Sequence, residues 1–282
     1  LTQRFDSTVG AGSVLAPFGG RTQTGPSQAM AALLPVLPGQ STEQASVMAW
    51  GCDPDLLSTD PYWGAYEAVY VSVAKLAAAG ADWRKAYLSL QEFFEKLRRD
   101  PRRWGKPFAA LLGALDAQME IGAAAIGGKD SMSGSFLDKD VPPTVISFAV
   151  APVQAGDVVS ADFKGAGHPV YLFEPEDWTD LHDLCRRGKV LSAWAVENGL
   201  AEAVMKLSFG NGVGFRAAGK HDWYTPAPGA VVVELAGPVE GLECLPLGET
   251  TAQPVVDLGG EQASVDELRA LNEGVLEGVY PL

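Results

Sequence analysis

The segment AIGGKDSMSGSF, residues 125–136, gathers side chains that could bind a ligand into one bend of the chain. Its adjacent glycines let backbone N–H groups approach a ligand closely, and the lysine that follows supplies a point charge suited to phosphate. Two serines add hydroxyl donors, and the aspartate can orient the lysine or hold a ribose. Successive amides in such a turn form an anion-binding nest. The predicted ligand contacts are Gly127, Gly128, Lys129, Asp130, Ser131 and Ser133.

A purely structural interpretation of this segment stays open, because small polar residues are also common in tight Gly-Gly turns. The segment matches neither the GxxxxGK[ST] phosphate loop nor the GxGxxG dinucleotide motif. The three cysteines, Cys52, Cys185 and Cys244, lack CxxC spacing, and the three histidines are scattered. The sequence therefore predicts no metal site, and it names no catalytic residue.

Composition narrows the class of protein and its partners. A formal net charge of −14 argues against nucleic-acid binding, which needs a basic face. The one basic cluster, KLRRDPRRWGK at residues 96–106, is interpreted as a solvated helix end, with a phosphate-docking surface as the alternative. No run approaches the roughly 18 apolar residues of a membrane span, so we expect no membrane partner. An odd number of cysteines is typical of a reducing compartment, which predicts a cytoplasmic location.

The first block of predicted elements surrounds the glycine-rich segment. Residues 44–50 and 144–153 have strand composition, and helices are predicted over residues 61–80, 84–99 and 106–122. The third helix aligns five large apolar residues on one face, Phe108, Leu111, Leu112, Leu115 and Met119.

The second block begins after a predicted linker. The linker covers residues 154–167. After it we expect strands at 168–175 and 229–237 and helices at 177–190 and 198–209. A last helix is opened by the capping box SVDE at 264–267. Strands alternate with helices in both blocks. We therefore predict two domains, an α/β domain with a mixed sheet over residues 1–154 and an α+β domain over residues 155–282. Residues 216–262 offer no site that the sequence identifies.

Long segments of the chain resemble a known family. They are RFDSTVGAGSVLAPFGG, ASVMAWGCDPDL, DPRRWGKPFAALLGALDAQM, AAIGGKDSMSGSF, VPPTVISFAVAPV and VLSAWAVENGLAEAVMKLSFGNGVGF. Together they look like the second half of the synthetase core in the large, single-chain phosphoribosylformylglycinamidine synthases. These belong to the aminoimidazole-ribonucleotide-synthetase-like superfamily. The resemblance covers most of residues 4–215. The chain begins without Met and ends in LEGVYPL, and we expect both ends to be cuts within a longer chain.

The resemblance implies a fold, a reaction and partners. The fold is an α/β N-domain plus an α+β C-domain, packed against a first synthetase half with nucleotide sites at the interface. The whole enzyme converts formylglycinamide ribonucleotide, ATP and glutamine to formylglycinamidine ribonucleotide, ADP, phosphate and glutamate. A glutaminase domain that this chain lacks supplies the ammonia. ATP and magnesium are thus cofactors of the whole enzyme, and none is predicted for this chain alone.

The resemblance also assigns roles to individual residues. Gly127 and Gly128 would bring amides to phosphate, and Lys129 would contact nucleotide, in a site shared with the first half. Some relatives hold an auxiliary nucleotide through metal-binding side chains in this half. The matching positions here are Val71, Lys75 and Ala195, which cannot ligate magnesium.

Two hypotheses follow. In the first, the chain is a fragment of an ATP-dependent amidoligase that supplies part of a nucleotide and substrate site and is inactive alone. In the second, it is a structural and assembly module of the same enzyme with a degenerate nucleotide site. The expected partners are the first synthetase half, the glutaminase domain and formylglycinamide ribonucleotide. If the surface meant for the partner half is exposed and apolar, a homodimer of this chain is expected.

Overall fold

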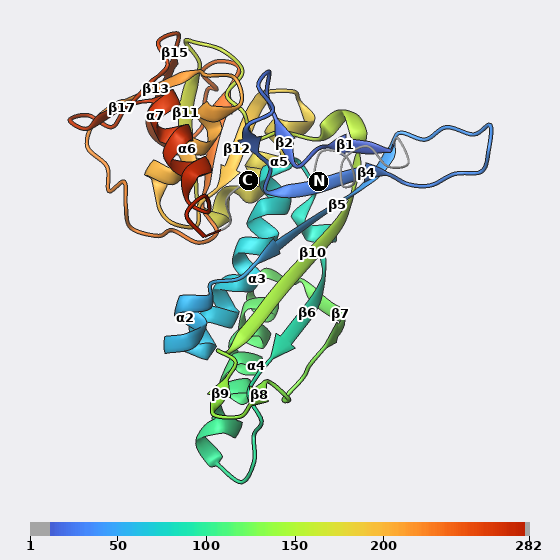
Figure 1. Ribbon diagram of the computed structural model, residues 1–282. Helices are drawn as coiled ribbons and strands as arrows, with labels where there is room; N and C mark the ends of the chain where they lie inside the picture. The colour runs from blue at the N-terminus through green and yellow to red at the C-terminus, as the bar shows by residue number, and fades with distance from the viewer. Residues whose placement is uncertain (1–11, 280–282) are drawn as a thin grey trace.

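The computed structural model describes residues 12–279, which form two β-sheets with helices packed against them (Figure 1). The first sheet has the strand order β1-β4-β5-β10-β6-β7. Its only parallel pair among the described strands is β6 with β7. The strands are β1 (Ser13–Leu15), β4 (Ala29–Leu33), β5 (Gln44–Gly51), β10 (Thr144–Gln154), β6 (Tyr87–Phe93) and β7 (Ala124–Lys129).

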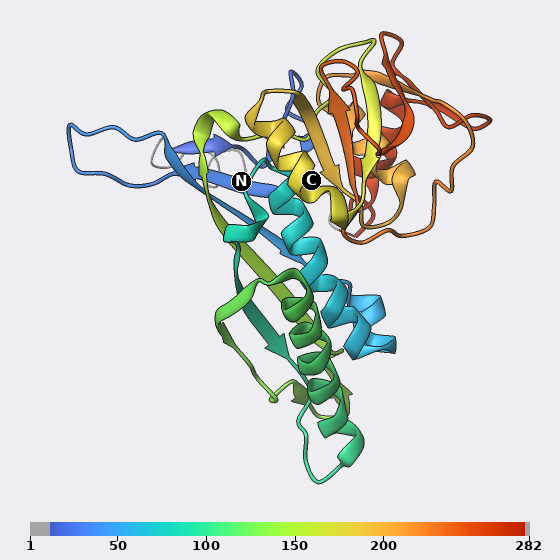
Figure 2. The same ribbon diagram turned by 180° about the vertical axis from the view of Figure 1, so that it is seen from behind.

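Helices cover one face of the first sheet, as Figure 2 shows from behind. They are α2 (Pro54–Thr59), α3 (Pro61–Ala78) and α4 (Pro101–Ile121). Residues of β5 alternate in exposure, so Val47 and Ala49 are buried while Met48 and Trp50 are exposed on the opposite face. Such alternation is expected of an antiparallel sheet with one covered face. The other face of this sheet therefore remains open in the described chain.

The second sheet has the strand order β12-β14-β11-β15-β13-β16-β17 and is covered on both faces. The central strand β14 shows this directly. Val231 and Val233 pack in the same core as α3 and α5, whereas Val232 packs in the core that α6 forms. The elements are β11 (Pro169–Phe173), α5 (Trp178–Arg186), β12 (Val190–Ala195), α6 (Leu200–Phe209), β13 (Gly214–Ala217), β14 (Val231–Leu235), β15 (Leu245–Thr251), β16 (Val255–Asp257), β17 (Gln262–Ser264) and α7 (Val265–Gly274).

Short elements complete the chain. They are the hairpin of β2 (Phe18–Gly19) and β3 (Gly25–Pro26), the hairpin of β8 (Ser135–Phe136) and β9 (Lys139–Asp140), and the 3-10 turns η1 (Trp83–Lys85), η2 (Ala155–Asp157) and η3 (Pro175–Asp177). No helix of the described residues is long and apolar enough to cross a membrane. The predicted α/β and α+β fold class is confirmed by this arrangement.

The two-domain division at residue 154 remains a proposal. All strands of the first sheet precede residue 155, and all strands of the second follow residue 168. One hydrophobic core nevertheless crosses the boundary, because α3 packs against β5 and β10 and also against β12 and α5. Residues 1–11 and 280–282, which belong to the predicted domains and to the family resemblance, lie outside the described part of the chain.

Most predicted elements are confirmed, but the helix predicted over residues 84–99 is wrong. Residues 87–93 form β6, which pairs with β10 on one side and β7 on the other. Leu88 and Leu90 are buried while Tyr87 is exposed, which is the two-residue period of a strand. Of the charged residues that suggested a helix surface, Glu92 lies within the strand, and Glu95, Lys96, Arg98 and Arg99 lie in the loop after it. Ladder hydrogen bonds to two neighbours outweighed the local helix propensity of this segment.

Candidate functional site

The glycine-rich segment lies at the edge of the first sheet, on β7 and the loop that follows it. Gly127 pairs with Ser89, and Gly128 pairs with Leu90, in the parallel ladder with β6. A side chain at Gly128 is excluded, because a Cβ there would lie 2.4 Å from the carbonyl oxygen of Leu90. Glycine is therefore required at this position by close contact with β6.

Backbone hydrogen bonds hold the loop after β7 in place. The Ser131 N–H donates to the Glu92 carbonyl at 3.0 Å, and the Phe94 N–H donates to the Ser131 carbonyl at 2.8 Å. Phe94 is fully buried, so it anchors this attachment in the core. Gly134 N–H also donates to the Phe94 carbonyl at 2.9 Å. The segment is thus fixed along its length although it lies at the surface.

The side chains of the segment face solvent. All six residues of β7 are exposed, as are Asp130 and Ser133, and Ser131 is half-buried. The Ser131 and Ser133 hydroxyls share a hydrogen bond of 2.7 Å, and the Lys129 ammonium lies 5.9 Å from the centre of the Phe93 ring. Burial, with a smaller contribution from the charge of Asp130, raises the pKa of Glu92. The structure brings the predicted contacts together on an open surface that a ligand would touch from one side only.

The basic cluster at residues 96–106 lies beside this segment and is engaged in ion pairs. Lys106 Nζ lies 3.0 Å from both carboxylate oxygens of Glu95. Arg103 pairs with Asp140 and donates to the Lys96 carbonyl at 3.0 Å. These bonds tie the start of α4 to β9 and to the segment after β6. They favour a structural role for part of this cluster.

A second candidate site is an acidic cavity of about 290 Å³ beside α2 and α3. Cys52, Asp53, Glu67 and Glu197 contribute to its lining, with Val71 from α3. Burial, and secondly the charge of Asp53, raises the pKa of Glu67 and that of the Cys52 thiol. The sequence signalled this cavity only through the family resemblance, which placed Val71 at a metal-binding position.

A buried lysine lies next to this cavity. Lys75 is 3% exposed, and its ammonium lies 2.9 Å from Glu197 Oε2 and 3.0 Å from the carbonyl oxygen of Trp50. It also lies 4.5 Å from the centre of the Trp50 indole ring. Gln28 donates to the other oxygen of Glu197 at 3.3 Å. One ammonium thereby links α3, β5 and the segment after β12.

Magnesium does not fit the three positions that the resemblance singles out. Val71 and Ala195 are buried apolar side chains, and the Lys75 ammonium already neutralises the adjacent carboxylate. Within residues 12–279, no group of three or more His, Cys, Asp or Glu side chains is arranged to hold a metal ion. No chemical step is assigned to a metal at this place.

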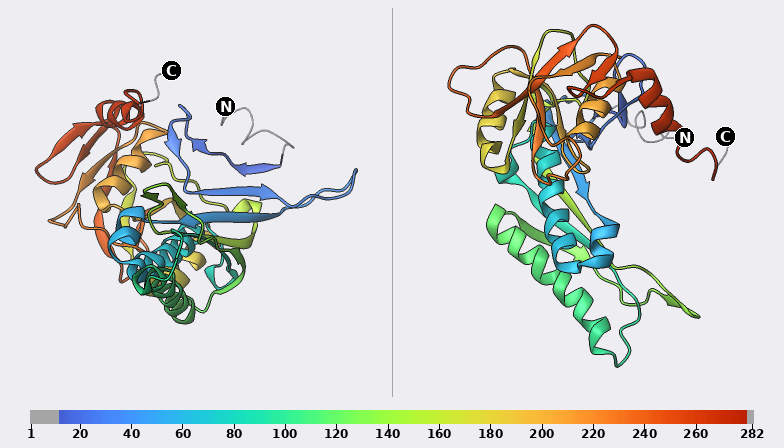
Figure 3. Two further views of the ribbon diagram at one scale, coloured as in Figure 1. Left: turned by 60° about the horizontal axis from the view of Figure 1, so that its bottom comes forward. Right: turned by 90° about the vertical axis from the view of Figure 1, so that its left-hand side faces the viewer.

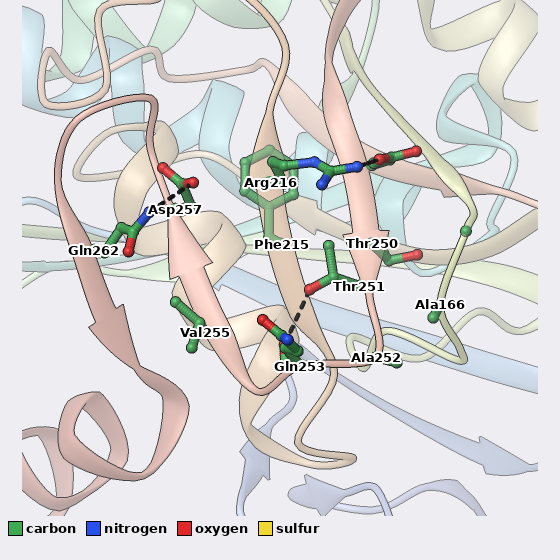
Figure 4. Close-up of a pocket in the computed structure, with 12 residues that line it drawn as sticks. Ala166, Phe215, Arg216, Thr250, Thr251, Ala252, Gln253, Val255, Asp257 and Gln262 are labelled. Atoms are coloured by element: carbon green, nitrogen blue, oxygen red, sulfur yellow. Dashed lines mark hydrogen bonds and ion pairs between the residues drawn. The ribbon is translucent and has the colours of Figure 1, made fainter.

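A third hollow, of about 520 Å³, lies on the second sheet among β13, β15 and β16 (Figure 4). Its polar side chains bond mainly to one another. Arg216 pairs with Glu249, and Gln262 donates to Asp257 at 2.9 Å. Residues 216–262 carried no interpretable signal in the sequence, and this hollow was missed for that reason.

The fold is similar to that of solved structures, several of which are complexes with nucleotides. Phosphoribosylformylglycinamidine synthase II (PurL) from Thermotoga maritima matches with a TM-score of 0.60 and 20% identity, over 88% of this chain and 40% of that chain. The same protein complexed with ATP matches with a TM-score of 0.60 and 20% identity, over 89% of this chain and 41% of that one. AaThiL complexed with AMPPCP and TMP matches with a TM-score of 0.59 and 12% identity, over 83% and 88%.

These likenesses show the fold, which is the aminoimidazole-ribonucleotide-synthetase-like fold of PurL and ThiL. The chain spans about two fifths of the length of the PurL structures that it matches. No protein-family model matches the sequence, and a search of curated proteins also finds no match.

Proposed function

We propose that this chain is part of an ATP-dependent amidoligase that acts on formylglycinamide ribonucleotide, in the second synthetase half of a large single-chain enzyme. The observation that carries the proposal is the GGKDSMS segment, which is fixed by β6 and Phe94 yet exposes most of its residues, Lys129 among them, to solvent. The T. maritima PurL of the same fold is known in complexes with ATP and with FGAR. The isolated chain is proposed to be inactive, and its location cytoplasmic.

The open face of the first sheet supports a partner half. Met30, Met48, Trp50, Tyr87 and Val150 are 38 to 52% exposed on described strands of this sheet. Contiguous exposed apolar side chains of this kind mark interaction surfaces. We propose that the first synthetase half packs on this face, close to the edge that carries the glycine-rich segment. The glutaminase domain would supply ammonia from elsewhere in the whole enzyme.

The residues of the GGKDSMS segment would offset the negative charge of a bound phosphate and orient the substrate. When bound, ATP would supply the phosphoryl group that makes the amide oxygen of formylglycinamide ribonucleotide a leaving group for displacement by ammonia. The Lys129 ammonium would offset negative charge on a phosphate oxygen, and the amides of Gly127 and Gly128 would donate to it. Ser131 would orient the substrate. These contacts come from one side, so the remaining contacts must come from the partner half.

The test is Lys129→Ala in the full-length enzyme. We expect kcat/KM to fall about 100-fold with an unchanged melting temperature, because a charged donor to the phosphate is lost from an exposed position. Lys139→Ala, on the exposed hairpin strand β9, is the matched control and should leave turnover unchanged. Normal turnover in Lys129→Ala would contradict direct contact.

A second candidate function is a structural and assembly module without a ligand of its own. The ammonium of Lys75, which fills the place beside Glu197 where a cation would bind, favours it. Calorimetric titration of this chain with magnesium-ATP, with and without formylglycinamide ribonucleotide, addresses both candidates. Micromolar binding would show that this half keeps a nucleotide site of its own. If this chain shows no binding of magnesium-ATP, and Lys129→Ala in the whole enzyme has normal turnover, the structural module is favoured.

A further inference from the structure

A polar hollow of about 260 Å³, called the α5 hollow below, lies between α5 and one end of the first sheet. It is lined by η1 with its N-cap residue, by η2, by the first residue of β5 and the last residues of β10, and by two side chains of α5. In the right-hand view of Figure 3, α5 (yellow) lies beside the end of α3, from which the chain turns into η1. The GGKDSMS segment is at the other end of this sheet. Gln91, the partner of Lys129, pairs with Ile146 near the start of β10, whereas the α5 hollow is at Gln154, where β10 ends.

His182 is the buried polar side chain of the α5 hollow. It is 9% exposed, and its Nδ1 is buried without a hydrogen-bond partner among the described residues. Buried polar groups of folded proteins are nearly always paired, so an unpaired one requires a specific explanation. Because the His182 side chain lines the hollow, a molecule bound there can form a hydrogen bond with the imidazole ring.

Two opposite charges, Arg186 and Asp157, also line the α5 hollow. Arg186 lies one helical turn after His182, so both side chains leave α5 on the same face. None of the ion pairs within residues 12–279 includes Arg186 or Asp157. A cation and an anion that line one hollow without pairing leave a place between them for a molecule that carries both charges.

The other polar side chains of the α5 hollow are already paired. Asp82 accepts a hydrogen bond from Nε of Arg84 at 2.8 Å, and the Lys85 ammonium lies 3.6 Å from its other oxygen. Partial burial raises the pKa of Asp82, but pairing with Arg84 outweighs burial, and the pKa is lowered overall. Gln154 donates to the side chain of Gln44 at 3.0 Å, and Gln44 donates to a backbone carbonyl of β10 at 2.9 Å. The groups left for an occupant are therefore one imidazole, one guanidinium and one carboxylate.

We infer that the α5 hollow binds a small zwitterion, namely a free α-amino acid. The carboxylate of the amino acid pairs with the Arg186 guanidinium, whose fork of donors matches two carboxylate oxygens. The ammonium group pairs with Asp157, and the His182 ring forms a further hydrogen bond. An inorganic anion fits less well, because it places negative charge beside the carboxylate of Asp157.

NMR titration of the 282-residue chain, labelled with isotopes at histidine, measures affinity and location together. The chain contains three histidines, so the ring signals of each can be assigned and followed. We expect L-alanine to shift the ring signals of His182 with a Kd on the order of 1 mM, because only three polar groups hold it in an open hollow. The signals of His168 and His221 should not move. A shift confined to either of these two histidines would overturn the location.

Two analogues of L-alanine test whether both charges are recognised. Propionate is alanine without the ammonium group, and ethylamine is alanine without the carboxylate. Each should bind at least about tenfold more weakly than L-alanine, because each leaves one charged group of the hollow unpaired. Binding of propionate or inorganic phosphate as tight as that of L-alanine would overturn the zwitterion. So would the absence of any binding by L-alanine, L-serine and L-glutamate.

Variants of the two unpaired charges test the assignment of the contacts. Arg186→Gln and Asp157→Asn should each weaken the binding of L-alanine by at least about tenfold, since each removes one charge pair. The matched controls are Arg187→Gln and Asp180→Asn, because these residues are exposed on or next to α5 but do not line the hollow. Both controls should bind L-alanine as the unchanged chain does. Circular dichroism confirms that each variant is folded, and unchanged binding in Arg186→Gln and Asp157→Asn contradicts the proposal.

Discussion

The helices α3 and α4 lie side by side on the same face of the first sheet, yet they differ in how many residues they bury and in whether any of these is large. In α3, 12 of 18 residues are buried, and they include Val69, Val73 and Leu76. In α4, only five of 21 residues are buried, and none is a large aliphatic or aromatic residue. The difference arises because α3 lies between two sheets, whereas α4 has described neighbours on one side only.

Close backbone contact explains which residues α4 buries. A Cβ on Gly113 would lie 2.0 Å from the carbonyl oxygen of Tyr62 at the start of α3. At that separation only small side chains fit between the helices, and Ala110, Ala114 and Ala117 surround the contact. The larger residues of α4 are consequently on its other side. A hydrophobic stripe thus indicates a buried face only when an element of the same chain lies there to cover it.

The largest expected effect on stability concerns the buried ion pair that α3 forms because it lies between the two sheets. Lys75→Ala should lower the free energy of unfolding by about 3 kcal/mol, because it leaves the carboxylate of Glu197 without its buried partner. Urea denaturation followed by circular dichroism measures this change. Lys85→Ala is the control, since Lys85 forms an exposed pair with Asp82 and should cost less than about 1 kcal/mol.

The double variant Lys75→Met with Glu197→Leu sharpens this test. Removing both charges should recover most of the lost stability, because well-packed apolar residues can replace a buried ion pair. If Lys75→Ala proves as mild as Lys85→Ala, the link between α3 and the segment after β12 contributes little to stability.

The second prediction concerns the contact between the two helices. Gly113→Ala should lower the free energy of unfolding by about 2 kcal/mol, because the new methyl group would push α4 away from Tyr62. Gly105→Ala, on the same helix with open space around it, should instead raise stability by up to about 1 kcal/mol through helix propensity. Equal effects at both positions would show that the close contact is not a constraint.

The smallest expected effect lies on the outer face of α4, in the α4 stripe of exposed apolar side chains formed by Trp104, Phe108, Leu111, Leu112, Leu115 and Met119. Phe108→Ser removes a large aromatic side chain that is 62% exposed, and at low protein concentration it should change the free energy of unfolding by only about 0.5 kcal/mol. This is less than the loss expected from adding one methyl group at Gly113 on the inner side of the helix. A loss of several kcal/mol in Phe108→Ser would mean that the stripe packs within its own molecule.

Much of the fold could be predicted from local patterns. The strand over residues 44–51 and the helix over residues 61–78 follow their hydrophobic periods, and Pro61 starts that helix as expected. The error over residues 84–99 shows the limit of such patterns. Glu92, Lys96 and Arg99 suggested a charged helix, but β10 and β7 offered hydrogen bonds on both sides of this segment.

Some features of the candidate site could likewise be predicted from the sequence, and others could not. Residue types alone indicated which groups of the GGKDSMS segment could bind phosphate. The need for glycine at Gly128 instead follows from its close contact with the Leu90 carbonyl oxygen of β6. The openness of that edge, the outward direction of the α4 stripe and the pairing of Lys75 with Glu197, 122 residues away, followed only from tertiary structure. The physical reason is that periodicity and residue chemistry are properties of a segment. Burial and charge pairing instead depend on which distant segments pack against it.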